Sequence, residues 1–142
     1  MNNEADLKNM LLEGAGQLSV DLDTLKADSL LKYKDVLAEW NEKINLTAIE
    51  DDRDVIIKHF IDSLSICQYV EKRDSMLIDV GTGAGFPGIP LKVAIEELKV
   101  TLLDSLDKRV KFLNEVISTL KLDGIRACLL YTSDAADEED SV

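Results

Sequence analysis

A glycine-rich turn that directly follows a short apolar run constrains the fold of this chain more than any other feature. The run is Met76-Leu77-Ile78-Asp79-Val80, and glycines follow at positions 81, 83, 85 and 88. A run of this length that ends in glycines is typical of a buried parallel strand. Glycine lets the backbone turn tightly and approach a ligand, and in an open parallel sheet that ligand lies beyond the carboxyl ends of the strands. The segment therefore predicts a ligand-binding turn.

Before this turn the chain reads as helices. We expect them over residues 4–17, 23–44 and about 52–69, with Gly14 and Gly16 interrupting the first and either Asp21 or Asp23 capping the second. Apolar side chains at helical spacing mark one face of the second and third helices. These are Leu30, Tyr33, Leu37, Trp40 and Ile44, and then Ile56, Phe60, Leu64 and Cys67.

After the turn, helices alternate with strands. A helix follows Pro87, a second strand covers residues 100–104, a second helix covers 108–121 and stops at Asp123-Gly124, and a third strand begins at Ile125. This order predicts an α/β fold with a Rossmann-like parallel sheet, preceded by a helical extension. A complete doubly wound sheet has about five or six strands, so a sheet of three is truncated. We divide the chain into 1–72, the N-terminal helical extension; 73–127, the first part of the Rossmann-like domain; and 128–142, an acidic tail.

Two kinds of ligand fit the glycine pattern. Gly83, Gly85 and Gly88 match the G-x-G-x-x-G of dinucleotide-binding turns. Asp79, Gly81, Gly83 and Gly85 instead match the acidic-x-G-x-G-x-G of class I methyltransferases. The Asp79 carboxylate would repel a pyrophosphate, whereas it would attract the sulfonium and ammonium cations of S-adenosylmethionine.

Two further features bear on the ligand. Pro87 and Pro90 crowd the helix start that a pyrophosphate would use. Asp104 lies 19 residues after Gly85, the spacing of an acid that accepts hydrogen bonds from ribose hydroxyls, which both ligands possess. Charge favours S-adenosylmethionine, and a dinucleotide and a purely structural loop remain the alternatives.

Composition limits the class of protein. The 142 residues carry a formal net charge of −12, which opposes nucleic-acid binding at long range, although part of the acidic excess lies in the last residues. Cys67 and Cys128 fit no metal spacing or disulfide framework. We find neither a secretory signal nor an apolar run of the roughly 18 residues that a membrane span needs, so we expect a cytoplasmic monomer with no metal.

The stretch from Tyr33 to Ala127 resembles the small-subunit ribosomal RNA guanine-N7 methyltransferases, also called the glucose-inhibited division protein B family. The matching segments cover about two thirds of the chain. They are Trp40-Asn41, Asn45-Leu46-Thr47-Ala48-Ile49, His59 with Asp62-Ser63-Leu64, Asp79 through Pro90, and Leu103-Asp104-Ser105 with Lys108-Arg109 and Phe112-Leu113.

The resemblance implies an S-adenosylmethionine-dependent enzyme that methylates N7 of one guanine in small-subunit ribosomal RNA. By the same resemblance, the donor site comprises the glycine motif with Asp79, together with Gly81 and Phe86 against the donor and Asp104 and Ser105 against its ribose and adenine. Guanine N7 has a lone pair and no proton to lose, so positioning can supply most of the catalysis and no catalytic residue is nominated.

Four residues are candidates for substrate contact: Asn45, His59, Lys108 and Arg109. Each also has a structural interpretation. Asn45 can cap or bridge its turn, as can Asn41, and His59 can be a hydrogen-bonded residue of its helix. Lys108 and Arg109 can begin a basic strip with Lys58 and Arg53, or can belong to a solvated helix face.

The chain departs from the family after Ala127. The family continues into a His-x-Arg-Ala-Glu-like segment, whereas this chain reads Cys128-Leu129-Leu130-Tyr131 and then becomes acidic. Residues 129–138 resemble a translated sequencing adapter, so we expect the tail to be non-native, which re-sequencing of the source DNA will test. We also expect low stability or aggregation and little turnover, because a truncated sheet leaves apolar faces uncovered.

Two other classes of function remain. One is a module that binds the methyl donor or RNA without catalysis, and the other is a nicotinamide-dependent oxidoreductase. Ligand preference separates the oxidoreductase from the other two classes, and activity of a full-length version separates the enzyme from the module.

Overall fold

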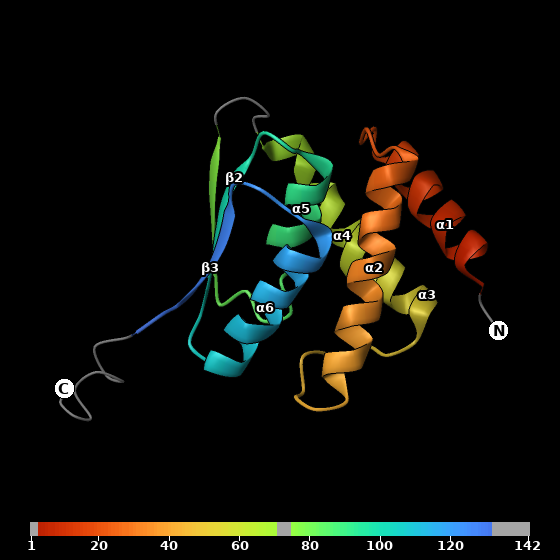
Figure 1. Ribbon diagram of the computed structural model, residues 1–142. Coiled ribbons are helices and arrows are strands. Elements are labelled where there is room, and N and C mark those ends of the chain that lie inside the picture. The colour runs from red at the N-terminus through yellow and green to blue at the C-terminus, as the bar shows by residue number, and fades with distance from the viewer. Residues whose placement is uncertain (1–2, 71–74, 132–142) are drawn as a thin grey trace.

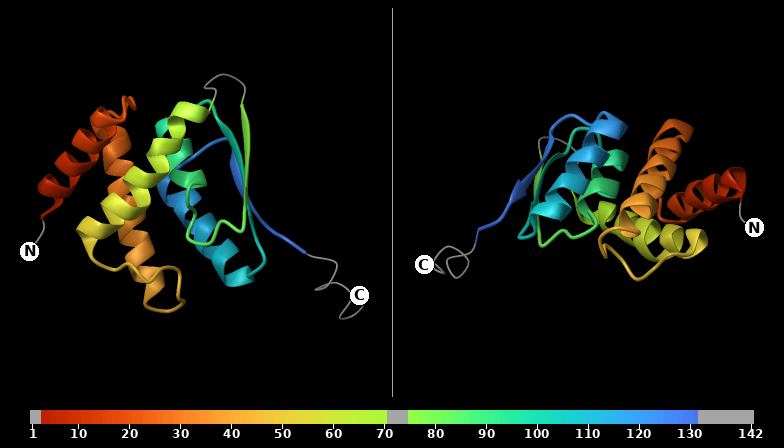
Figure 2. Two further views of the ribbon diagram at one scale, coloured as in Figure 1. Left: turned by 180° about the vertical axis from the view of Figure 1, so that it is seen from behind. Right: turned by 60° about the horizontal axis from the view of Figure 1, so that its bottom comes forward.

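The structure, a computed structural model, describes residues 3–70 and 75–131, and consists of a three-stranded sheet with every helix on one side of it (Figures 1 and 2). The elements in chain order are α1 (Glu4–Gln17), α2 (Thr24–Asn41), α3 (Asp52–Asp54), η1 (Val55–Ile61), α4 (Asp62–Leu64), η2 (Ser65–Tyr69), β1 (Met76–Val80), α5 (Gly88–Ala94), β2 (Lys99–Asp104), α6 (Asp107–Leu120) and β3 (Ile125–Leu129). No helix within the described part of the chain is long and apolar enough to cross a membrane.

The sheet has the order β1-β2-β3, and both strand pairs are parallel. Helix α5 connects β1 to β2 and α6 connects β2 to β3, which is the β-α-β-α-β order that the sequence predicts. The α/β class and the helical part that precedes the sheet are therefore confirmed. All three carboxyl ends lie at one edge of the sheet, and the glycine-rich turn leaves β1 there.

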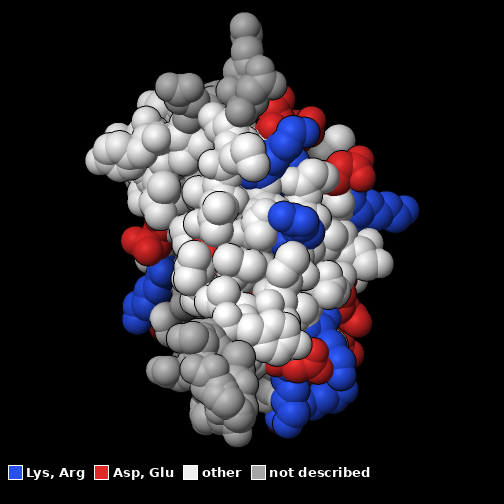
Figure 3. Space-filling view, turned by 90° about the vertical axis from the view of Figure 1, so that its left-hand side faces the viewer, with Lys and Arg blue, Asp and Glu red and all other residues white. Residues whose placement is uncertain are grey.

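The outer face of the sheet is uncovered by the described residues, which corrects the expectation of a buried first strand. Met76, Ile78 and Val80 are 77%, 62% and 64% exposed. Their partners on β2, which are Lys99, Thr101 and Leu103, are also exposed or half-buried, whereas Leu102 on the opposite face is fully buried. Figure 3 views the outer face, where uncharged side chains predominate and a few basic ones interrupt them. A strand of this length is buried on both faces only if something covers both faces.

The first two helices form largely as predicted. Helix α1 runs unbroken through Gly14, and a Cβ built there would lie 2.5 Å from Cδ1 of Ile61, so glycine lets α1 approach η1 closely. Asp23 is the cap of α2, where its side chain accepts a hydrogen bond from the Lys26 N–H. Helix α2 ends at Asn41 rather than at residue 44.

The third predicted helix is one continuous helical stretch from Asp52 to Tyr69 with three geometries. Short α-helical turns flank η1, a π-helical turn, and the stretch ends in the 3₁₀ turn η2. Ile56, Phe60 and Leu64 are fully buried, as their spacing predicts, and Cys67 is nearly so. π-Helical turns are rare and occur frequently at functional sites.

The second half differs from expectation at two boundaries. Helix α6 stops at Lys121, which adopts a left-handed conformation with φ of 55°, instead of at Asp123-Gly124. Gly124 also has a positive φ, in the turn that leads to β3. Strand β3 continues past Ala127 to Leu129, and the Leu130 N–H then donates to the Asp104 carbonyl at 2.8 Å. The sheet therefore includes the first residues of the segment that we assigned to the tail, while residues 132–142 lie outside the described range.

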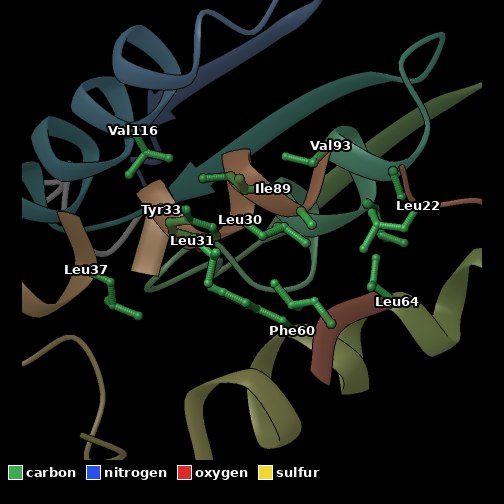
Figure 4. Packing of buried hydrophobic residues seen from close by; sticks show 14 of the residues in the cluster. Leu22, Leu30, Leu31, Tyr33, Leu37, Phe60, Leu64, Ile89, Val93 and Val116 are labelled. Atoms are coloured by element: carbon green, nitrogen blue, oxygen red, sulfur yellow. The ribbon is translucent and has the colours of Figure 1, made fainter. Parts of the chain in front are cut away.

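One hydrophobic core joins the helical extension to the sheet domain. Figure 4 shows Tyr33 from α2, Phe60 from η1, Ile89 from α5 and Val116 from α6 pointing into it. All four side chains are fully buried. The boundary that we predicted at residue 72 falls within a chain segment outside the described residues, and the side chains on either side of it share this core.

Candidate functional site

The glycine loop crosses the carboxyl end of β2. The N–H groups of Gly81 and Thr82 donate to the Leu103 carbonyl at 2.8 and 3.1 Å. Gly81, Gly83 and Gly85 have φ values of 68°, 61° and 99°. L-residues rarely adopt these values, so the loop depends on glycine at these positions.

Asp79, at the end of β1, connects the start of the loop to the start of α5 through its side chain. Its Oδ2 accepts hydrogen bonds from the Thr82 hydroxyl at 2.7 Å and from the Gly88 N–H at 3.0 Å. Burial raises the pKa of Asp79, these two hydrogen bonds oppose the rise, and the nearby Asp104 carboxylate adds to it. A Cβ at position 88 would lie 3.0 Å from Oδ2, so the glycine there allows the carboxylate to reach the first turn of α5.

Asp104 holds the same loop from β2. Its side chain is 1% exposed, and its Oδ2 accepts from the Gly83 N–H at 2.9 Å. Its Oδ1 accepts from the Leu106 N–H at 3.0 Å, and Arg109 lies at a longer 3.4 Å from the same oxygen. A carboxylate offers about four acceptor positions, so Oδ2 retains capacity for one further donor.

Tyr33 connects the helical extension to the loop. Its hydroxyl, fully buried, donates a hydrogen bond to the Ala84 carbonyl, and burial together with Asp79 raises the pKa of Tyr33 well above its ordinary value. Helical spacing placed Tyr33 on an apolar stripe and did not predict this contact. The available signal was the hydroxyl, because a buried tyrosine usually needs a hydrogen-bond partner.

Phe86 lies against the helical stretch that carries His59. The two rings are stacked, with centroids 4.3 Å apart and planes at 9°, and the His59 Nε2 is 2.8 Å from the Thr47 hydroxyl oxygen. Phe86 also contacts the rings of Tyr33 and Phe60. Burial lowers the pKa of His59, and the Asp62 carboxylate partly opposes that change. The structure thus brings together Phe86 and His59, which are 27 residues apart in the sequence.

Asn45 and Asn41 have different positions in the loop after α2. The Asn41 amide accepts from the N–H groups of Leu46 and Thr47 and donates to the Thr47 carbonyl. Asn41 therefore bridges the turn, as its structural interpretation predicts. Asn45 is exposed at the tip of this loop.

The remaining candidates lie at the start of α6. Ser105 and Lys108 are exposed, whereas Arg109 is directed toward the buried Asp104. Lys58 pairs with Asp54 at 3.8 Å within its own helical stretch. Because Arg109 and Lys58 each pair with a carboxylate of the protein, these ion pairs favour a solvated helix face over a basic strip.

Space remains open above the glycine loop. A Cβ built on Gly81 or on Gly83 would meet no atom of the described residues within 4 Å, in contrast to the crowded Gly85 and Gly88. Both open positions belong to the glycine loop, and the carboxylates of Asp79 and Asp104 hold this loop in place through hydrogen bonds. This arrangement offers acceptors and negative charge to a ligand that lies on the loop.

Comparison with known families decides what kind of chain this is. The profile of GidB, described as rRNA small subunit methyltransferase G, matches residues 26–140. The chain belongs to this family. The matched range continues beyond Ala127, where we placed the end of the resemblance, and whether the tail is native stays a prediction.

Curated relatives agree with the family. The chain is 60% identical over 122 residues to the Ribosomal RNA small subunit methyltransferase G of Acetivibrio thermocellus, covering 86% of this chain and 50% of that protein. It is 56% identical over 119 residues to the protein of the same name from Alkaliphilus oremlandii, covering 82% of this chain and 49% of that protein. The chain thus spans about half the length of the curated relatives that it matches.

One solved structure that aligns with this chain is that of a protein-L-isoaspartate O-methyltransferase from Plasmodium falciparum. Its sequence identity is 17% and its TM-score 0.49, over 98% of this chain and 68% of that one.

Proposed function

We propose that this chain supplies the donor-binding half of an S-adenosylmethionine-dependent methyltransferase that acts on N7 of a guanine in small-subunit ribosomal RNA. Membership of the rRNA small subunit methyltransferase G family, over residues 26–140, is the observation that carries the proposal. Such an enzyme works on ribosomal RNA in the cytoplasm, and we expect the whole enzyme to be a monomer, whereas this chain alone has an uncovered apolar sheet face and is expected to self-associate. Turnover by this chain alone is expected to be low, because the chain spans about half of its relatives.

The geometry of the loop supports a methyl donor. The space above Gly81 and Gly83 leaves room for a ligand at the carboxyl edge of the sheet. Asp104 Oδ2 has one unused acceptor position, which a ribose hydroxyl reaches only when ligand binding uncovers the buried carboxylate, and the exposed Ser105 follows it directly. The partly buried Asp79 provides the negative charge that favours a cationic ligand. These residues fit the donor chemically.

The same geometry disfavours a dinucleotide. A pyrophosphate would seek the free N–H groups at the start of α5. Gly88, the first residue of α5, already donates its N–H to the Asp79 carboxylate, and Pro90 in the same turn has no N–H to offer. An anionic ligand would therefore meet a carboxylate where it needs donors.

Positioning is the main task of the protein in this reaction. The donor supplies an electrophilic methyl group on a sulfonium, and guanine N7 attacks with its lone pair without losing a proton. The chain therefore has to hold two groups in line and exclude other nucleophiles. Asp79 and Asp104 fix the loop, and the Phe86 ring bounds its far end beside α5.

Substrate contacts are part of the proposal. Asn45 and Lys108 are exposed and available to RNA, whereas Arg109 and His59 already have partners within the protein. We therefore assign RNA contact first to Asn45 and Lys108, and assign Arg109 and His59 a supporting part.

Calorimetry of the chain tests the donor. S-adenosylmethionine should bind and NAD should not, with circular dichroism as a check of folding. Asp104→Asn should weaken donor binding, whereas Thr119→Val, on the exposed face at the far end of α6, should leave it unchanged. Binding of NAD alone would refute the proposal.

A chimera tests the reaction. The matched 122 residues of the Acetivibrio thermocellus protein would be replaced by those of this chain, leaving the other half intact. Labelled methyl groups should then appear in small-subunit RNA, at guanine N7, and Asn45→Ala should reduce the rate. A folded chimera that binds the donor and labels no RNA would refute the assigned reaction.

A further inference from the structure

The aromatic ring that bounds the donor loop is supported from behind by a residue of the helical extension. Phe86 lies two residues before the start of α5 at Gly88, and one face of its ring lies flat on His59 with a centroid separation of 4.3 Å. Phe86 is half-buried, and its ring also contacts the rings of Tyr33 and Phe60 at centroid separations of 5.5 and 5.8 Å. The His59 ring is the nearest and most nearly parallel of these three neighbours, so it restrains the Phe86 ring most directly.

The His59 ring has a fixed orientation because Thr47 holds its Nε2. The Thr47 hydroxyl oxygen accepts from the Ile49 N–H at 3.0 Å and lies 2.8 Å from Nε2 of His59, with which it shares a hydrogen bond. Burial lowers the pKa of His59 and so favours the neutral imidazole, in which Nε2 can accept the hydroxyl proton.

Thr47 is in turn held by the loop after α2. The Asn41 side chain accepts from the Thr47 N–H and donates to the Thr47 carbonyl, both at 3.0 Å. The chain of contacts thus begins at the end of α2, next to the exposed Asn45, and ends at Phe86.

The helical geometry around His59 serves the same contact. His59 lies within η1, where the π-helical turn Val55–Ile61 widens the backbone. Two consecutive side chains then reach the same aromatic group, since His59 stacks on Phe86 while Phe60 stacks on Tyr33 at 5.3 Å and contacts Phe86 at 5.8 Å. In a regular helix, consecutive residues point about 100° apart, which works against such a pair.

We infer that Thr47 and His59 are positioning residues that form a strut, Thr47–His59–Phe86, which sets the Phe86 ring against the bound methyl donor. The strut transmits the state of the loop that carries Asn45 to the donor site. The donor at its end rests on the proposed function, whereas the strut itself is a property of the folded chain.

The strut has a direct spectroscopic readout because His59 is the only histidine of the chain. Its ring protons should resonate upfield, shielded by the Phe86 ring, and should titrate below the ordinary histidine pKa. The charged group acting on it is Asp62 of the same helical stretch, while the adjoining Thr47 and Phe86 are uncharged. Thr47→Val, which removes the hydroxyl at nearly constant volume, should change the chemical shifts and the titration midpoint of the His59 ring. Phe86→Leu should abolish the upfield shift.

Donor binding provides the second readout, through a double-mutant cycle. Thr47→Val should weaken S-adenosylmethionine binding about 3- to 10-fold, although Thr47 lies behind the ring and not on the donor. In a Phe86→Leu background the same substitution should change binding less than about 2-fold, because the strut then has nothing to position. Thr119→Val is the matched control and should change neither the histidine resonance nor the affinity.

The outcomes separate the strut from the proposed function. A His59 resonance that is unshifted in the native chain and indifferent to Thr47→Val overturns the strut, as does an equal loss of affinity in both Phe86 backgrounds. If the folded chain binds no S-adenosylmethionine, the proposed donor is refuted, and the histidine titration still decides whether the strut exists.

Discussion

Gly85→Ala tests how closely the helical extension packs on the glycine loop. A Cβ at this position would lie 2.5 Å from the Tyr33 hydroxyl oxygen, 2.7 Å from Cδ1 of Ile89 and 3.2 Å from Cδ2 of Leu113. Gly85 also has a φ of 99°, which an alanine adopts only under strain. One added methyl group therefore meets three elements at once and disturbs the loop itself.

The magnitude follows from two contributions. Backbone strain at positive φ costs about 1–2 kcal/mol, and overpacking of a filled core costs about 1–3 kcal/mol. We expect Gly85→Ala to lower the free energy of unfolding by about 2–5 kcal/mol, a large share of the roughly 5–15 kcal/mol typical of folded domains.

Two other glycines separate these contributions. Gly81 has a φ of 68° and open space around its Cβ position, so Gly81→Ala should cost only the strain, about 1–2 kcal/mol. Gly16 lies in α1 with neither positive φ nor neighbours, so Gly16→Ala should stabilise the chain by about 0.5–1 kcal/mol.

Urea denaturation followed by circular dichroism measures all three free energies. Tyr33→Phe adds a second test, because it removes the oxygen that the new methyl group meets while leaving Ile89 and Leu113 in place. The double variant should lose less stability than the sum of the single variants. Equal losses for Gly85→Ala and Gly81→Ala, with strict additivity to Tyr33→Phe, would refute the close packing that we describe.

Two further predictions concern charge and exposure. Burial raises the pKa of Asp79, so the free energy of unfolding falls as the pH rises from the ordinary aspartate pKa to the raised value, and the full cost is present above the raised value. By urea denaturation, Asp79→Asn should therefore be at least as stable as the native chain near pH 7.5 and similar to it below about pH 4. By calorimetry, the same variant should bind S-adenosylmethionine more weakly. A less stable Asn variant with unchanged donor affinity would contradict this. Ile78 is exposed on the uncovered sheet face, so the native chain should self-associate with rising concentration in sedimentation velocity, and Ile78→Lys should reduce this association. A chain that stays monomeric at every concentration would contradict the second prediction.

The glycine loop and its supporting carboxylates could be predicted from the sequence because they depend on local spacing. Asp79 and Asp104 end neighbouring parallel strands, and carboxyl ends of such strands meet at one edge of the sheet. The alternation of strands and helices fixed which residues reach that edge. No tertiary information was needed beyond the parallel order.

Contacts between the helical extension and the loop could not be predicted in the same way. Tyr33 has the spacing of an apolar stripe, and helical spacing alone does not distinguish it from Leu37 one turn later. The π-helical turn at His59 has no sequence signature that we know, because its residues also suit an ordinary helix. Stacking of His59 on Phe86 depends on packing between segments that are far apart in the chain.

Burial of β1 shows a different limit. The apolar run that begins at Met76 predicts a strand that is buried on both faces, and the described residues cover only one. The apolar pattern of a strand shows which of its faces are suited to burial, whereas the exposed fraction of its side chains depends on which neighbouring elements cover those faces. The apolar run is therefore suited to burial on both faces, while Ile78 is exposed because no described element covers the outer face.

Asp104 has one observed role and one proposed role, and this affects how the donor site has to be tested. The carboxylate was predicted as an acceptor for ribose hydroxyls, and in the structure it also anchors the loop through the Gly83 and Leu106 N–H groups. Asp104→Ala would remove both functions, so loss of binding in that variant cannot identify a ribose contact. A donor analogue that lacks one ribose hydroxyl isolates the contact, because it leaves the protein unchanged. If Asp104 holds the ribose, that analogue should bind more weakly to the native chain and should lose this disadvantage in Asp104→Asn; if Asp104 only anchors the loop, the disadvantage should be the same in both.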